Sequence, residues 1–189
     1  AMRAVARRQG FPGLHITVNI ANYENDQTLH CWWPQLVERI RKAGGDSVYG
    51  YNVARTYGFK SLTDASPLVP YEDVLKSHEE LFRLCENCGL PFHPVATVGC
   101  DNSPRWHRGA TLPVDFRNLH YEPVVVGNTP ELFGECVRLC LESIRRCGGG
   151  DRMLFINAWN EWTEGCHLLP DTWYGNGYLE ALAEKLNAR

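Results

Sequence analysis

A strand–helix–strand unit can be recognised in residues 124–158, VVVGNTPELFGECVRLCLESIRRCGGGDRMLFINA. After three valines comes Thr129, a residue that can cap a helix, and a proline suited to the first helical turn. Apolar residues then recur at intervals of three and four from Leu132 to Ile144, which predicts an amphipathic helix. Three glycines end the helix, and the apolar run from Met153 to Ala158 predicts a buried strand. Such a unit is typical of parallel β/α folds.

The same alternation extends outward through the rest of the chain. Further strands are predicted at residues 14–20, 47–53 and 92–98, and further helices at 1–10, from Pro34 to the glycines at 44–45, at 71–88 and at 177–186. A (β/α)8 barrel takes about 250 residues. We therefore expect an α/β protein of parallel β/α units, the C-terminal half of a (β/α)8 TIM-type barrel, forming one partial domain over residues 1–189. A small open α/β sheet is the alternative.

Composition and charge exclude several classes of function. The net charge is −3, and the basic residues are dispersed, so no nucleic-acid partner is expected. No apolar run reaches the roughly 18 residues of a membrane-spanning helix. The charged N-terminal residues are not followed by the apolar segment of a secretory signal. The first βα turn lacks a glycine-rich phosphate-binding pattern, which argues against a dinucleotide cofactor, and no cofactor is predicted.

The eight cysteines are interpreted as reduced core residues. Cys85 and Cys88 have a metal-type spacing, but no second pair stands at the distance of a zinc finger. Cys136 and Cys140 lie on the apolar stripe of their helix. The scattered histidines do not predict a metal site, and His167 is interpreted as a solvated loop residue. Free thiols and the lack of a signal favour a cytoplasmic location.

Polar residues gather after the predicted strands, where the carboxyl ends of parallel strands bind ligands. Residues 155–165, FINAWNEWTEG, change from an apolar strand to a cluster of carboxylates, amides and indoles. Glycosidic bond cleavage needs one carboxyl group that delivers a proton and a second that acts as base or nucleophile. The catalytic candidates are Glu161 and Glu164. The substrate-binding candidates are Asn160, Trp162, Asp101, Asn102 and Arg105.

Three motifs in order resemble those of WbsX-type proteins. They are FINAWNEWTEG at 155–165 with its continuation to residue 181, DNSPR at 101–105, and NTPELF at 128–133. The WbsX-type proteins are described as glycosyltransferases and are related to glycoside hydrolase family 99, the endo-α-mannosidase family. The resemblance covers about residues 70–185. Cys100 and Leu169 depart from it, since tryptophan and glutamate are usual at these positions.

The resemblance implies a (β/α)8 barrel and a retaining glycoside hydrolase acting on α-linked mannose-type glycans. Glu161 would deprotonate the 2-hydroxyl of the sugar to give a 1,2-anhydro intermediate, and Glu164 would act first as general acid and then as base. A glycosyltransferase of cell-surface polysaccharide synthesis of the O-antigen type is one alternative, although no Asp-x-Asp motif is present. A non-catalytic glycan-binding or scaffold fragment is the other. The expected partners are a glycan and, at open sheet edges, a second copy or an N-terminal half-barrel.

Overall fold

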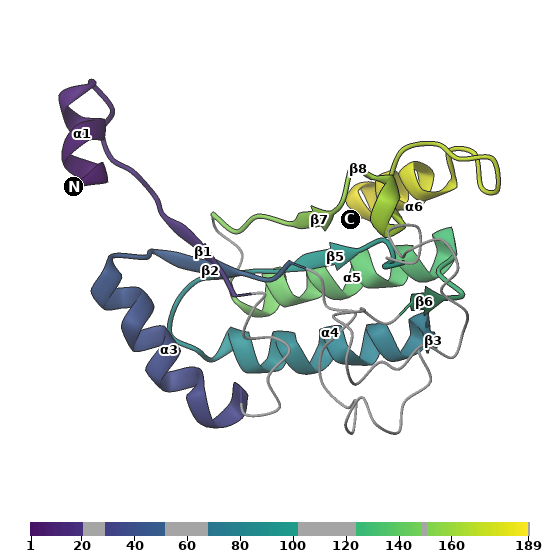
Figure 1. The fold of residues 1–189 in the computed structure, drawn as a ribbon, viewed down its shortest axis with the longest axis horizontal. Coiled ribbons are helices and arrows are strands. Elements are labelled where there is room, and N and C mark those ends of the chain that lie inside the picture. Colours follow the sequence, from purple (N-terminus) through teal and green to yellow (C-terminus); the bar gives the residue numbers. More distant parts are fainter. Residues whose placement is uncertain (21–28, 52–67, 102–123, 149–150, 189) are drawn as a thin grey trace, which may run out of the picture.

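The computed structural model describes residues 1–20, 29–51, 68–101, 124–148 and 151–188 (Figure 1). Its helices are α1 (Met2–Arg8), α3 (Leu29–Ala43), α4 (Tyr71–Glu86), α5 (Pro130–Arg146) and α6 (Gly177–Asn187). Its main strands are β1 (Thr17–Asn19), β2 (Ser47–Tyr49), β4 (Phe92–His93), β5 (Val95–Thr97) and β7 (Phe155–Asn157). Two further strands, β3 (Leu68–Pro70) and β6 (Val124–Val126), form a small parallel pair.

The main strands are all parallel and follow the order of the chain. β1 pairs with β2, β2 with β4, and β5 with β7, and Pro94 alone separates β4 from β5. Among the described strands this order does not reverse, unlike that of a doubly wound sheet. The α/β class and the parallel units are thus confirmed. The described strands do not close into a barrel.

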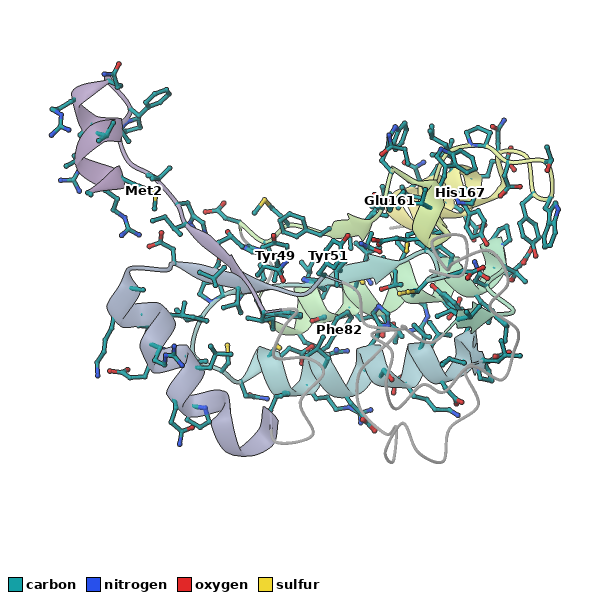
Figure 2. The ribbon with its side chains drawn as sticks, in the orientation of Figure 1. Met2, Tyr49, Tyr51, Phe82, Glu161 and His167 are labelled. Atoms are coloured by element: carbon teal, nitrogen blue, oxygen red, sulfur yellow. The ribbon has the colours of Figure 1, made fainter. Side chains whose placement is uncertain are left out.

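The helices α3, α4 and α5 cover one face of these strands (Figure 1). The core between strands and helices contains Val48, Phe82, Phe92 and Phe133, all of which are essentially inaccessible to solvent. The opposite face carries Tyr49, which stacks on Phe155 with ring centroids 4.7 Å apart. Figure 2 shows Tyr49 and Tyr51 on this second face, away from Phe82.

The cysteine prediction holds where the structure describes it. Cys85, Cys136 and Cys140 are buried in the core, and Cys88 and Cys147 are partly buried. None of the described cysteines forms a disulfide. Burial raises the pKa of the Cys88 thiol, as expected for a cysteine that behaves as a small apolar residue.

Most observed elements are shorter than predicted, and two larger differences concern α3 and β3. α3 begins at Leu29, so Pro34 lies inside the helix and not at its start. A proline there removes one backbone hydrogen bond, while the helix is held to the core through the buried side chains of Leu36, Val37 and Ile40. The second difference is β3, which falls in a stretch predicted to be a loop; three residues are too few to show a strand pattern.

Candidate active site

The stretch after β7 folds into a small antiparallel hairpin. Its strands are β8 (Asn160–Glu161) and β9 (Cys166–His167), and a single 3₁₀ turn, Trp162–Glu164, connects them. The turn closes at Gly165, whose φ of 61° lies in the left-handed region. Both candidate catalytic carboxylates, Glu161 and Glu164, are thereby carried on a hairpin at the carboxyl end of β7, and both are partly buried.

The hairpin is fixed against the segment that follows β5. The backbone N–H of Asp101 donates to the carbonyl oxygen of Glu164 at 2.6 Å. The Cys166 thiol donates to the carbonyl of Gly99 at 2.7 Å. Hydrogen bonding with Cys100, together with burial, raises the pKa of the Cys166 thiol, so this thiol is neutral at ordinary pH.

Close packing requires glycine on both sides of this contact. A Cβ atom on Gly165 would lie 2.9 Å from the Cβ of Asp101, and a Cβ atom on Gly99 would lie 2.8 Å from the carbonyl oxygen of Gly165. The two backbones therefore approach to a distance that no side chain permits. The sequence-predicted neighbours, the hairpin and Asp101, do meet in the structure.

The two carboxylates have different surroundings. The Thr163 hydroxyl donates to Oε1 of Glu161 at 2.7 Å, which orients this carboxylate within its own turn. The charge of Glu164 contributes to raising the pKa of the Tyr51 phenol. Burial is the largest cause of this rise, and the Asn157 amide opposes it by hydrogen bonding.

Tyr51 and Asn157 are functional candidates that the sequence reasoning missed. Tyr51 lies two residues beyond β2, on the sheet face that also carries Tyr49 (Figure 2). Asn157 ends β7 and is 2% exposed, and its side-chain amide interacts with the phenol of Tyr51. The strand was predicted at residues 47–53, which placed Tyr51 inside it, whereas β2 ends at Tyr49 and leaves Tyr51 beyond its carboxyl end.

The indole of Trp162 stacks on the imidazole of His167, with ring centroids 3.9 Å apart and an interplanar angle of 22°. Nε2 of His167 lies 3.4 Å from Oδ2 of Asp171. The interpretation of His167 as a solvated residue is therefore wrong, because its side chain is only 20% exposed between an indole and a carboxylate. Sequence spacing could not show this stack, since it depends on the hairpin.

Beside the hairpin lies a cleft of about 510 Å³. Asp101 and Trp162 line it, whereas Glu161 and Glu164 do not. Asn160 is exposed and pairs with His167 across the hairpin. The remaining candidates, Asn102 and Arg105, fall outside the described residues.

Among the described residues, no group of three His, Cys, Asp or Glu side chains is arranged to hold a metal ion. In the same part of the chain, no helix is both long and apolar enough to span a bilayer.

A sequence profile of the family described as Glycosyltransferase WbsX matches residues 1–182. The chain belongs to this family. The resemblance found in the motifs is thus confirmed, and membership of the WbsX family places the chain broadly among carbohydrate-active enzymes.

Individual relatives cover less of the chain. Proteins named Uncharacterized protein WxcX, from two strains of Xanthomonas campestris pv. campestris, are 54% identical over 35 residues, which is 18% of this chain and 5% of theirs. A solved structure, the Penicillium canescens endo-1,4-beta-xylanase XylE, is 13% identical with a TM-score of 0.44 and is matched over 99% of this chain and 50% of its own. The WbsX chain described here therefore spans half of that structure and a small part of the curated relatives.

Proposed function

We propose that this WbsX-family chain carries the catalytic edge of a retaining glycoside hydrolase that acts on α-linked mannose-type glycans. The observation that carries the proposal is the β8–β9 hairpin, which fixes Glu161 and Glu164 at the carboxyl end of β7 and against the segment after β5. Ligands of parallel β/α folds bind at this end of the strands. The chain-order arrangement of the parallel strands supports a place in a (β/α)8 barrel, with the remaining strands supplied by a further segment or another copy.

In the proposed reaction, the carboxylate of Glu161 takes the proton of the 2-hydroxyl. The 2-oxygen attacks the anomeric carbon as the glycosidic C–O bond breaks, and Glu164 gives its proton to the leaving oxygen. Glu164 then takes a proton from water, which opens the 1,2-anhydro ring at the anomeric carbon, while Glu161 returns a proton to the 2-oxygen. The two displacements together retain the anomeric configuration.

The surroundings of the carboxylates suit these roles. The hydrogen bond from Thr163 holds Oε1 of Glu161 and so fixes the orientation of this carboxylate. A fixed orientation favours proton transfer to the carboxylate in one defined direction. A phenol is protonated at neutral pH, and burial together with the charge of Glu164 raises the pKa of Tyr51 further. A protonated phenol beside Glu164 can donate a hydrogen bond to a sugar oxygen or to this carboxylate.

The test is hydrolysis of α-mannan oligosaccharides by the chain and by the isosteric variants Glu161→Gln and Glu164→Gln. Each variant is expected to lower kcat by about a hundredfold to ten-thousandfold, the usual contribution of a general acid or base. Glu180→Gln is the matched control, because Glu180 is an exposed carboxylate on α6. Normal turnover by Glu164→Gln would remove this residue from the mechanism.

The description of the family itself favours a second candidate, glycosyl transfer. A nucleotide-sugar donor carries a diphosphate, which proteins commonly hold with lysine, arginine or a glycine-rich loop. Titration calorimetry with nucleoside-diphosphate sugars distinguishes the two functions. Tight binding together with transfer to an oligosaccharide would replace the hydrolase proposal, while glycan binding that survives loss of both carboxylates without any turnover would indicate a scaffold.

A further inference from the structure

The cleft beside the hairpin collects exposed aromatic side chains. Trp162, Trp173 and Tyr174 all line it, and they are 48%, 87% and 39% exposed. Its floor is apolar and includes Val98 and Val125, which are almost fully buried. Clustered exposed aromatic residues mark binding surfaces more often than isolated ones do. A volume of about 510 Å³ lies within the usual range of about 300–1,000 Å³ for small-ligand clefts.

Hydrogen bonds hold this aromatic wall in place. Oδ1 of Asp171 accepts from the backbone N–H groups of Trp173 and Tyr174 at 2.7 and 2.6 Å. The other oxygen of Asp171 faces His167, on which Trp162 stacks. One carboxylate therefore orders the backbone that carries Trp173 and Tyr174 and also contacts the imidazole on which Trp162 stacks.

A second set of contacts fixes Tyr178, which also lines the cleft. The Tyr178 hydroxyl donates to the carbonyl oxygen of Asn128 at 2.6 Å, and the Asn128 amide lies 3.3 Å from the same hydroxyl. The ring of Tyr174 meets that of Tyr178 edge to face at a centroid distance of 5.6 Å. The ring of Tyr174 therefore rests against a tyrosine that is itself held by hydrogen bonds.

The charge of the lining restricts the ligand. Among the described residues that line the cleft, Asp101 and Asp171 carry carboxylates, and His167 lies beside Asp171. Phosphate, sulfate and uronate groups would be repelled by the carboxylates of Asp101 and Asp171. Apolar ring faces together with hydrogen-bonding edges suit a pyranose, which presents C–H groups on its faces and hydroxyls at its rim.

We propose that the cleft between Asp101, Trp162 and Trp173 is an additional subsite for a neutral pyranose unit of the glycan. It adjoins the hydrolytic carboxylates, because Trp162 lies between Glu161 and Glu164 in the 3₁₀ turn, but it does not include them. The subsite deepens the proposed function and rests on it for the identity of the glycan. It binds a sugar unit away from the bond that is cleaved.

The test measures the affinity of neutral α-mannan oligosaccharides from disaccharide to hexasaccharide by titration calorimetry, with the chain and with Trp173→Ala. Affinity is expected to rise with length for the chain, and the variant is expected to bind the hexasaccharide about tenfold more weakly because one stacking face is removed. Phe11→Ala is the control, because Phe11 is 62% exposed and does not line the cleft. Oligogalacturonates of the same lengths are expected to bind at least about tenfold more weakly than the neutral series.

The outcomes separate this proposal from the hydrolase proposal. Equal hexasaccharide affinity of Trp173→Ala and the chain would overturn the subsite, even if Glu164→Gln abolishes turnover. Tighter binding of the uronates would overturn its neutral specificity. Length-dependent binding that Trp173→Ala weakens, without any turnover by the chain, would support the subsite and refute the hydrolase. No binding of any neutral glycan would overturn both.

Discussion

The close contact between Gly165 and Asp101 gives a prediction with a built-in control. Gly165→Ala places a methyl group 2.9 Å from the Cβ of Asp101 and 3.1 Å from its backbone nitrogen, at a φ of 61°. Gly148→Ala imposes a comparable left-handed strain at a φ of 82°, but its methyl group meets nothing within 4 Å. Both variants are therefore destabilised by the left-handed backbone, and only Gly165→Ala is also destabilised by a steric clash.

The left-handed conformation costs a non-glycine residue about 1–2 kcal/mol. Forcing an extra methyl group into close packing costs about 1–3 kcal/mol more. We therefore expect the free energy of unfolding to fall by about 1–2 kcal/mol in Gly148→Ala and by about 2–5 kcal/mol in Gly165→Ala. Gly165→Ala should also lower hydrolysis, because the collision moves the hairpin that carries both glutamates.

Urea unfolding followed by tryptophan fluorescence measures both free energies, provided that the slope m is unchanged between variants. Hydrolysis of α-mannan oligosaccharides measures the displacement of the hairpin. Equal losses of stability in the two variants would refute the reasoning, because they would show that the hairpin is not seated against Asp101.

Three further predictions concern Tyr51, Thr129 and His93. In Glu164→Gln the phenol of Tyr51 should titrate at a lower pH than in the unmodified chain, since the charge of Glu164 helps to raise its pKa. An unchanged phenolate absorbance curve would show that the two residues do not interact. Thr129→Ala should lower the free energy of unfolding by about 1 kcal/mol through loss of the cap on α5, whereas Thr129→Ser should keep it. Urea titrations measure both changes, and equal losses in the two variants would show that the hydroxyl does not cap the helix. Burial lowers the pKa of His93, so the unfolded chain takes up the proton first, and stability should decrease as the pH falls below about 6.5. His93→Gln should show a weaker decrease in the same unfolding experiments, and an identical pH profile would assign the effect to other groups.

Much of the fold follows from the sequence because its helices satisfy several local rules at once. α5 has a capping threonine, a proline in the first turn and an unbroken apolar stripe, and it begins at the predicted residue. The parallel strands are recognisable because they are buried and apolar. Residues 29–33 precede the proline that was taken as the helix start, and no local signal marks them as helical.

The candidate site is only partly readable from sequence. The carboxylates stand out because Glu161 and Glu164 follow an apolar strand among indoles and amides. The stack of Trp162 on His167 depends on the hairpin between them, and the interaction of Tyr51 with Glu164 joins segments far apart in the chain. Two-residue strands contain no periodicity from which such contacts could be inferred.

The configuration of the first sugar released from an α-mannan oligosaccharide tests the central claim most directly. Proton NMR during the first minutes of hydrolysis distinguishes the α from the β anomer before they equilibrate. Retaining cleavage by Glu161 and Glu164 predicts the α anomer first, and its loss in both glutamine variants. Initial release of the β anomer, or α-anomer release that persists without both carboxylates, would contradict the account.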